Sequence, residues 1–153
     1  MEEYKSLLRE LFAANVRFLV VGGYATIAHG YTRATDDLDI WIEPVRENAR
    51  RALEALARFG TDVADLSVDN LADPYSFFRI GGDEGRKIDV IGHVEGLEFG
   101  ACHRDRYETE FLGLDVPFLG LRDLIHNKVA VGRHKDLADV EGLRAFHRLK
   151  DEG

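Results

Sequence analysis

Two aspartates in one short segment have the type and spacing that metal and phosphate chemistry requires. Asp37 and Asp39 are separated by one apolar residue in Asp37-Leu38-Asp39-Ile40. Polar and apolar residues alternate over 37–42, which predicts a half-buried strand with both carboxylates on one face. Neighbouring carboxylates repel each other, and a cation between them offsets that repulsion. The pair is therefore interpreted either as ligands for Mg²⁺ or Mn²⁺, which prefer oxygen ligands, or as the solvated end of an acidic strand.

A pair of glycines precedes these aspartates. Gly22 and Gly23 follow the apolar run 18–21, which predicts a buried strand, and 13 residues separate Gly23 from Asp37. A backbone without side chains can approach phosphate oxygens, and a helix expected over 24–29 would direct free N–H groups toward them. The other interpretation is a tight turn that requires a positive φ angle.

A third acidic residue lies in a later apolar segment. Asp89 is the one acid of residues 87–91, which predict a strand. Residues 77–80 predict its neighbour, and the polar residues 81–85 between them predict the turn of a hairpin. An acid in such a strand either faces solvent or has a functional role.

The remaining periodicities predict the elements that hold these residues. Apolar residues at helical spacing predict further helices, and a short strand is expected near 116–119. These helices span 2–14, 47–59, 122–131 and 137–149. The pattern predicts one α/β domain over residues 1–153, with a core of about 1–121 and a helical segment of about 122–150.

The last of these helices carries two specific expectations. Asp136 is the expected cap of its N-terminus. The residues expected to face inward are Leu137, Val140, Leu143, Phe146 and Leu149.

Charge and composition restrict the class of protein. The chain has 153 residues, with 20 Lys+Arg, 28 Asp+Glu and a formal net charge of −8, which argues against sequence-independent coating of nucleic acid. The single cysteine, Cys102, excludes an internal disulfide and a cysteine-based zinc site. No apolar run approaches the ~20 residues that span a membrane, and without a secretory signal we expect a cytoplasmic protein. Residues 122–150 differ from the rest, because seven basic and four acidic side chains make this segment basic.

The order of the glycine pair, the D-x-D pair and the third acid resembles the nucleotidyltransferase superfamily. The longer string GGYATIAHGYTRATDDLDIWIEP resembles small bacterial or archaeal members related to the AbiEii abortive-infection toxins and to lincosamide nucleotidyltransferases. Residues 127–140 resemble the K … R-x-K-D-x-x-D stretch of the same group. The resemblance covers nearly the whole chain and implies a mixed β-sheet flanked by helices.

The resemblance also implies an activity, the metal-dependent transfer of a nucleoside monophosphate from an NTP to a hydroxyl group. Asp37, Asp39 and Asp89 would hold two Mg²⁺ (or Mn²⁺) ions that clamp the NTP phosphates. Asp89 would be the general base for the acceptor hydroxyl. The β- and γ-phosphates would lie against the backbone of Gly22 and Gly23.

Polar and basic side chains are expected to add contacts to the phosphates or the acceptor. These residues are Arg33, Thr35, Lys128, Arg133 and Lys135. Arg33 is alternatively a solvated surface charge, and Lys128 a lysine with a packed aliphatic stem and a solvated amine. Asp139 is expected to pair with Arg133 or Lys135.

Chain length restricts the acceptor site. Only about thirty residues follow Leu121, whereas larger members of the superfamily carry a helical domain that builds this site. We therefore expect it to be shallow, or to be completed by a second subunit or a partner chain. The acceptor remains open among tRNA, a protein side chain and a small molecule. The alternative function is non-catalytic binding of a nucleotide or partner, for example in a toxin–antitoxin pair.

Overall fold

A six-stranded mixed sheet forms the centre of the molecule. The computed structural model describes residues 1–81 and 86–152. The strands lie in the order β3-β4-β2-β1-β6-β5. Their bounds are β1 Phe18–Val21, β2 Asp37–Ile42, β3 Phe77–Ile80, β4 Lys87–Ile91, β5 Tyr107–Phe111 and β6 Leu114–Phe118. Because β2 pairs with β4 and β1 with β6 in parallel, while the other pairs are antiparallel, the predicted mixed α/β architecture is confirmed.

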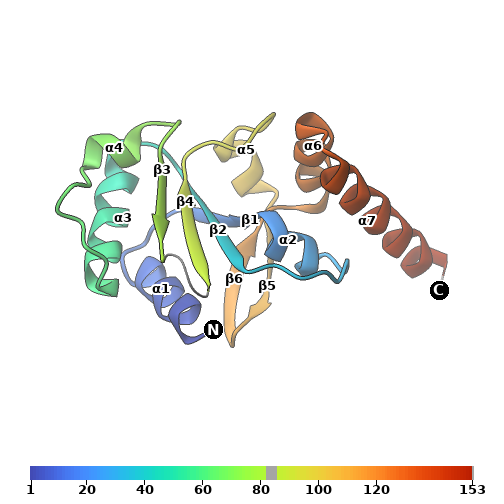
Figure 1. The fold of residues 1–153 in the computed structure, drawn as a ribbon, viewed down its shortest axis with the longest axis horizontal. Coiled ribbons are helices and arrows are strands. Elements are labelled where there is room, and N and C mark those ends of the chain that lie inside the picture. Colours follow the sequence, from blue (N-terminus) through green and yellow to red (C-terminus); the bar gives the residue numbers. More distant parts are fainter. Residues whose placement is uncertain (82–85, 153) are drawn as a thin grey trace.

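Seven helices of the described chain surround this sheet (Figure 1). They are α1 Glu2–Ala13, α2 Gly22–Ala28, α3 Arg46–Phe59, α4 Val68–Ala72, α5 Phe99–Arg104, α6 Leu121–Val131 and α7 His134–Glu152. Helices α3 and α4 lie at one end of the molecule, and α6 and α7 lie together at the other. None of the helices in the described ranges has both the length and the apolar composition needed to cross a membrane.

The core explains why β2 presents its aspartates to one face. Leu38 and Ile40 are fully buried, whereas Asp37 and Asp39 retain some solvent contact. This alternation is the one expected for a strand with one face packed in the core. The core side chains include leucines of α1 and alanines of α3. Burial of the apolar face therefore fixes the direction of both carboxylates.

Two short helices and one strand were not predicted from the sequence. Helices α4 and α5 have five and six residues, too few to show a clear helical period. Strand β5, YETEF, alternates charged and apolar residues at an edge of the sheet. The expected 81–85 turn lies, apart from Gly81, outside the described residues.

Helix α7 corrects two expectations. It begins at His134, so Asp136 lies within its first turn and is not its N-terminal cap. Leu137, Phe146 and Leu149 are 44%, 41% and 69% exposed, so the prediction that they face inward is wrong. The physical reason is that α7 extends away from the sheet (Figure 1), so only a narrow stripe that includes Val140 and Leu143 is buried.

Candidate active site

Strand register places the glycine pair and two of the acids side by side. Val21 pairs with Asp39 across β1 and β2, and Asp39 pairs with Asp89 across β2 and β4. Paired residues of adjacent strands point to the same face of a sheet. The carboxylates of Asp39 and Asp89 therefore share one face, and the chain leaves β1 beside them through Gly22.

Both glycines are required by close approaches to other site residues. Gly22 has φ +70°, and a Cβ atom there would overlap Oδ2 of Asp39. A Cβ atom at Gly23 would lie 2.7 Å from Oγ1 of Thr35 and 3.3 Å from Nη2 of Arg33. Gly22 thus faces a carboxylate, whereas Gly23 faces a hydroxyl and a guanidinium group.

The helix after β1 begins earlier than expected. Helix α2 starts at Gly22, so the glycine pair forms its first turn rather than a separate turn before Tyr24. Thr26 is buried, and its hydroxyl donates a hydrogen bond to the carbonyl oxygen of Gly22 over 3.1 Å. This bond secures the backbone of the turn.

Neither Asp37 nor Asp39 forms an ion pair among the described residues. Burial, reinforced by the nearby carboxylates of Asp89 and Asp37, raises the pKa of Asp39 to about 7, although Arg79 and Lys135 act in the opposite direction. Oδ1 of Asp37 is buried and has no hydrogen-bond partner among the described residues. Carboxylates in such surroundings favour the binding of a cation.

Asp89 is held by an arginine that the sequence analysis did not single out. Its buried carboxylate accepts two hydrogen bonds from Arg79, from Nε over 2.7 Å and from Nη2 over 2.9 Å. Arg79 lies opposite Asp89 in the β3–β4 pair. A strand arginine beside an acid was the available signal, but the length of the intervening turn, and hence the register, was unknown.

The donor set fits a divalent cation at Asp37 and Asp39. Carboxylate oxygens are the ligands that Mg²⁺ and Mn²⁺ prefer, and Oδ1 of Asp37 is free of hydrogen bonds. Within the described part of the chain, no group of three or more His, Cys, Asp or Glu side chains is arranged to hold a metal ion. Since Arg79 donates one hydrogen bond to each oxygen of Asp89, this third acid has fewer lone pairs to offer a metal ion while the guanidinium stays in place.

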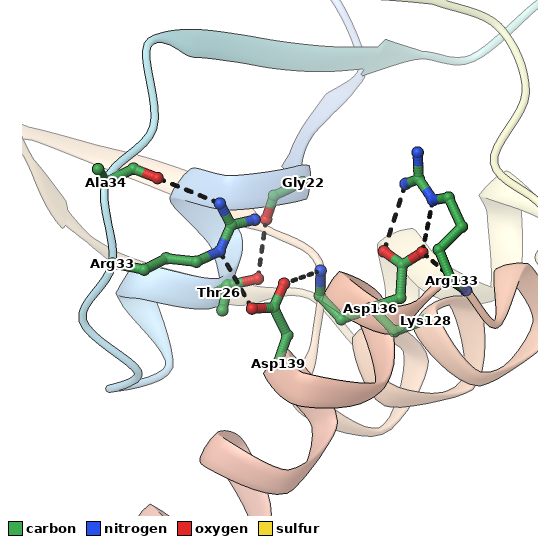
Figure 2. Close-up of polar contacts among 8 residues, drawn as sticks. All are labelled: Gly22, Thr26, Arg33, Ala34, Lys128, Arg133, Asp136 and Asp139. Atoms are coloured by element: carbon green, nitrogen blue, oxygen red, sulfur yellow. Dashed lines mark hydrogen bonds and ion pairs between the residues drawn. The ribbon is translucent and has the colours of Figure 1, made fainter.

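Basic residues of α6 and the loop after α2 form the opposite wall (Figure 2). Nζ of Lys128 lies 2.7 Å from Oδ2 of Asp139, and both side chains are buried. Nε of Arg33 lies 3.2 Å from Oδ1 of the same carboxylate. The expectation that Asp139 pairs with Arg133 or Lys135 is therefore wrong.

A second ion pair explains where Arg133 is held. Its Nε donates to Oδ2 of Asp136 over 2.7 Å, and its backbone N–H also donates to this oxygen over 3.3 Å. Although burial opposes ionisation of Asp136, the hydrogen bond and charge of Arg133 lower the pKa of this carboxyl below its ordinary value. Because α7 starts at His134, Asp136 points back to the preceding turn, and Asp139 points to α6 and the loop after α2.

A cavity of about 260 Å³ joins the two walls. Seven of the predicted site residues line it: Gly22, Gly23, Arg33, Asp39, Lys128, Arg133 and Lys135. Thr35, Asp37 and Asp89 do not line it, although Thr35 contacts the Gly23 turn. His93, Glu95 and Asn127 also line the cavity and were not predicted.

A larger cavity of about 770 Å³ lies elsewhere, between α5 and α6. Its lining includes Cys102, Asp105, Arg122 and His126 but none of the predicted site residues. The smaller cavity is the candidate active site. It is lined by Asp39, whose strand partner is Asp89, by the backbone of the glycine pair and by several basic side chains.

Comparison with known proteins gives a likeness in structure. No protein-family profile matches the chain, and no curated protein matches it. The chain is similar to the crystal structure of the "putative nucleotidyltransferase (TM1012)" from Thermotoga maritima, with 18% identity and a TM-score of 0.54. The alignment covers 99% of this chain and 95% of that one. At this identity the likeness establishes the fold, and the chain has the nucleotidyltransferase fold.

Proposed function

We propose that the protein is a metal-dependent nucleotidyltransferase, which transfers a nucleoside monophosphate from an NTP to a hydroxyl group of an acceptor. The observation that carries this proposal is the cavity in which Gly22, Gly23 and Asp39 meet the cations of Lys128 and Arg33. Asp39 forms no ion pair among the described residues, and Lys128 and Arg33 share a single carboxylate, so the two sides together are complementary to a metal-bound polyphosphate.

The volume of the cavity supports binding of the phosphates rather than of the whole nucleotide. At about 260 Å³ it is smaller than the ~300–1,000 Å³ typical of small-molecule sites. The phosphates would fill it, and the sugar and base would lie outside. Exposed Lys135 and Arg133, at the start of α7, are placed to contact these phosphates.

Asp37 and Asp39 are the residues that would hold the metal, and Asp89 would complete the set. A bound Mg²⁺ supplies neutralisation of phosphate charge and a lowered pKa for the acceptor hydroxyl. Asp89 is also the candidate general base. In either role its carboxylate competes with Arg79, which donates a hydrogen bond to each of its oxygens.

The proposal is tested by transfer of label. The protein is incubated with Mg²⁺ and each α-labelled NTP, with total tRNA, a protein extract or hydroxylated small molecules as acceptors. We expect labelled product with the wild type and none with Asp39→Asn. Asp36→Asn is the matched control, because Asp36 is an exposed aspartate immediately before β2 and this variant removes the same charge. Label transfer that survives in Asp39→Asn, or that is absent with every NTP and acceptor, would contradict the proposal.

The second candidate function is nucleotide binding without transfer. One observation favours it, namely that Arg79 holds the acid that transfer requires. In that case the wild type binds NTP, and no acceptor becomes labelled under any condition. Arg79→Gln would then also remain inactive, whereas an enzyme held back by this ion pair would transfer label faster.

A further inference from the structure

Asp139 lies behind the cavity wall and connects two of the cations that form it. Its side chain is 5% exposed and does not line the cavity, whereas Lys128 and Arg33 do. Each of its oxygens serves a different cation, with Oδ2 at 2.7 Å from Lys128 and Oδ1 at 3.2 Å from Arg33. Figure 2 shows the carboxylate between the two basic groups.

The three charges come from elements that are distant in the sequence. Arg33 lies in the loop after α2, Lys128 on α6 and Asp139 on α7. Two cations that contact one carboxylate lie close enough to repel each other. The carboxylate between them lowers that repulsion and leaves one net positive charge. A buried carboxylate is costly to keep without such partners.

Arg33 is held in a way that leaves part of its guanidinium available. Its Nε is buried and forms no hydrogen bond of good geometry, so its contact with Asp139 is an ion pair rather than a directed hydrogen bond. Nη1 donates to the carbonyl oxygen of Ala34 over 3.2 Å. Nη2 lies beside Gly23, 3.3 Å from where a Cβ atom would be. The guanidinium therefore reaches the cavity beside Gly23, where no side chain separates it from the backbone.

The two glycines divide the cavity into an acidic and a basic side. A Cβ atom at Gly22 would meet the carboxylate of Asp39, and a Cβ atom at Gly23 would meet the hydroxyl of Thr35 and then the guanidinium of Arg33. A polyphosphate bound along this turn would have one end at Asp39, the proposed metal ligand, and the other end at Arg33 and Lys128. The reacting phosphate belongs beside the carboxylate, so the terminal phosphate belongs beside Arg33 and Lys128.

We propose that Asp139 is a positioning residue that holds Lys128 and Arg33 together, so that both bind the terminal phosphate of an NTP. This inference rests on the proposed function, because it takes the cavity as the nucleotide site. It assigns Asp139 no contact with the nucleotide. It also gives the bound triphosphate a direction, from Asp39 at the reacting end to Lys128 and Arg33 at the terminal end.

The test uses Asp139→Asn, for which a pure charge effect and the loss of a positioning residue predict opposite changes in phosphate binding. Removal of a negative charge next to the cavity, by itself, makes the site more positive and tightens binding of phosphates. In Asp139→Asn, however, Lys128 and Arg33 lose their common partner and separate. We therefore expect ATP to bind at least tenfold more weakly to Asp139→Asn than to the wild type, with Mg²⁺ present. AMP, which has no terminal phosphate at the basic side, is expected to change by less than twofold.

The matched control is Glu141→Gln. Glu141 is an exposed acid of the same helix, so this variant loses the same charge without disturbing the cations. Its affinity for ATP is expected to equal or slightly exceed that of the wild type. Unchanged or tighter ATP binding in Asp139→Asn would overturn the proposal. An equal loss for ATP and AMP would overturn it too, because it would indicate a general structural role.

A second variant keeps the test valid if Asp139→Asn does not fold. Replacement of a buried ion pair by apolar residues often preserves stability, so Lys128→Met with Asp139→Leu is expected to fold. Here the proposal predicts a wild-type melting temperature and a lost preference for ATP over AMP. A retained preference would overturn it. Failure of the proposed function looks different, since the wild type itself would then transfer no label, whereas these binding comparisons concern Asp139 and the cations that it holds.

Discussion

Asp39 couples the charge of the candidate site to the stability of the protein. Burial and the neighbouring carboxylates raise its pKa from 3.8 to about 7. In the unfolded chain this carboxyl ionises near pH 4, but in the folded protein it keeps its proton until about pH 7. The folded state therefore binds more protons between these values, so the free energy of unfolding decreases as pH rises through this window and levels off above it.

The expected size of this effect follows from the shift. About three pKa units at ~1.4 kcal/mol per unit correspond to at most about 4 kcal/mol of stability lost by pH 8. Because Asp39 retains some solvent contact, we take roughly 2–4 kcal/mol. For a chain of this size, each kcal/mol changes the melting temperature by about 2–4 °C. Asp39→Asn, which cannot ionise, should therefore melt roughly 5–15 °C above the wild type at pH 8 without metal.

The assay is thermal unfolding, followed by circular dichroism, of both proteins in EDTA from pH 4 to pH 8. The difference between them should become small near pH 4, where Asp39 is protonated in the folded wild type and only about half ionised in the unfolded chain. Asp36→Asn, the exposed neighbour, should show no such pH-dependent difference. Addition of Mg²⁺ at pH 8 should raise the melting temperature of the wild type and leave that of Asp39→Asn nearly unchanged. If the melting temperature of Asp39→Asn at pH 8 is equal to or below that of the wild type, the conclusion that the ionised carboxylate of Asp39 destabilises the folded protein is refuted.

Two further predictions concern the glycine turn and the arginine on the third acid. Gly22→Ala and Gly60→Ala each place a side chain at a positive φ angle, with a cost of about 1–2 kcal/mol in unfolding experiments, and Gly22→Ala should cost more because its Cβ atom would also overlap Oδ2 of Asp39. Only Gly22→Ala should also abolish ATP binding, because the space around Gly60 is open and the space around Gly22 is not; equal binding by both variants would contradict this. Arg79→Gln should bind Mn²⁺ roughly tenfold more tightly than the wild type in a titration followed by electron paramagnetic resonance, because Asp89 becomes available. Arg58→Gln, which removes an exposed arginine of α3, should bind Mn²⁺ as the wild type does, and weaker binding by Arg79→Gln would show that this arginine does not compete with the metal.

Local patterns in the sequence were enough to predict the acidic strand. The alternation over Asp37–Ile40 determined the shared face of Asp37 and Asp39, because burial of Leu38 and Ile40 requires that arrangement, and the strand continues through the buried residues Trp41 and Ile42. Such a pattern needs no knowledge of the neighbouring strands.

The partners of the site residues depended on information that a local pattern does not contain. The contact between Arg79 and Asp89 requires the register of the β3–β4 pair. The contact of Asp139 with Lys128 and Arg33 requires knowledge of how α7 packs against α6 and the loop after α2. Lys135 lies one helical turn before Asp139 in α7, so local spacing favoured that pair, and tertiary packing supplied other partners.

The inward face of α7 was mispredicted for a related reason. Apolar periodicity defines a stripe along a helix but not how much of that stripe another element covers. Val140 and Leu143 are buried, whereas Leu149, near the end of α7, is largely exposed. How far a helix extends beyond the elements it packs against depends on the tertiary structure and not on its own sequence pattern.

The division of the candidate site between the two ends of the chain has a consequence for biosynthesis. The glycine turn and Asp39 are translated within the first 40 residues, whereas Lys128 and Asp139 come more than 80 residues later. A ribosome-bound chain that has not yet released α7 therefore holds Asp39 and Arg33 without Asp139, the carboxylate that connects Arg33 to Lys128. The nascent protein acquires its complete set of charges only when the last helix docks, so a chain terminated before α6 would lack Lys128 and Asp139.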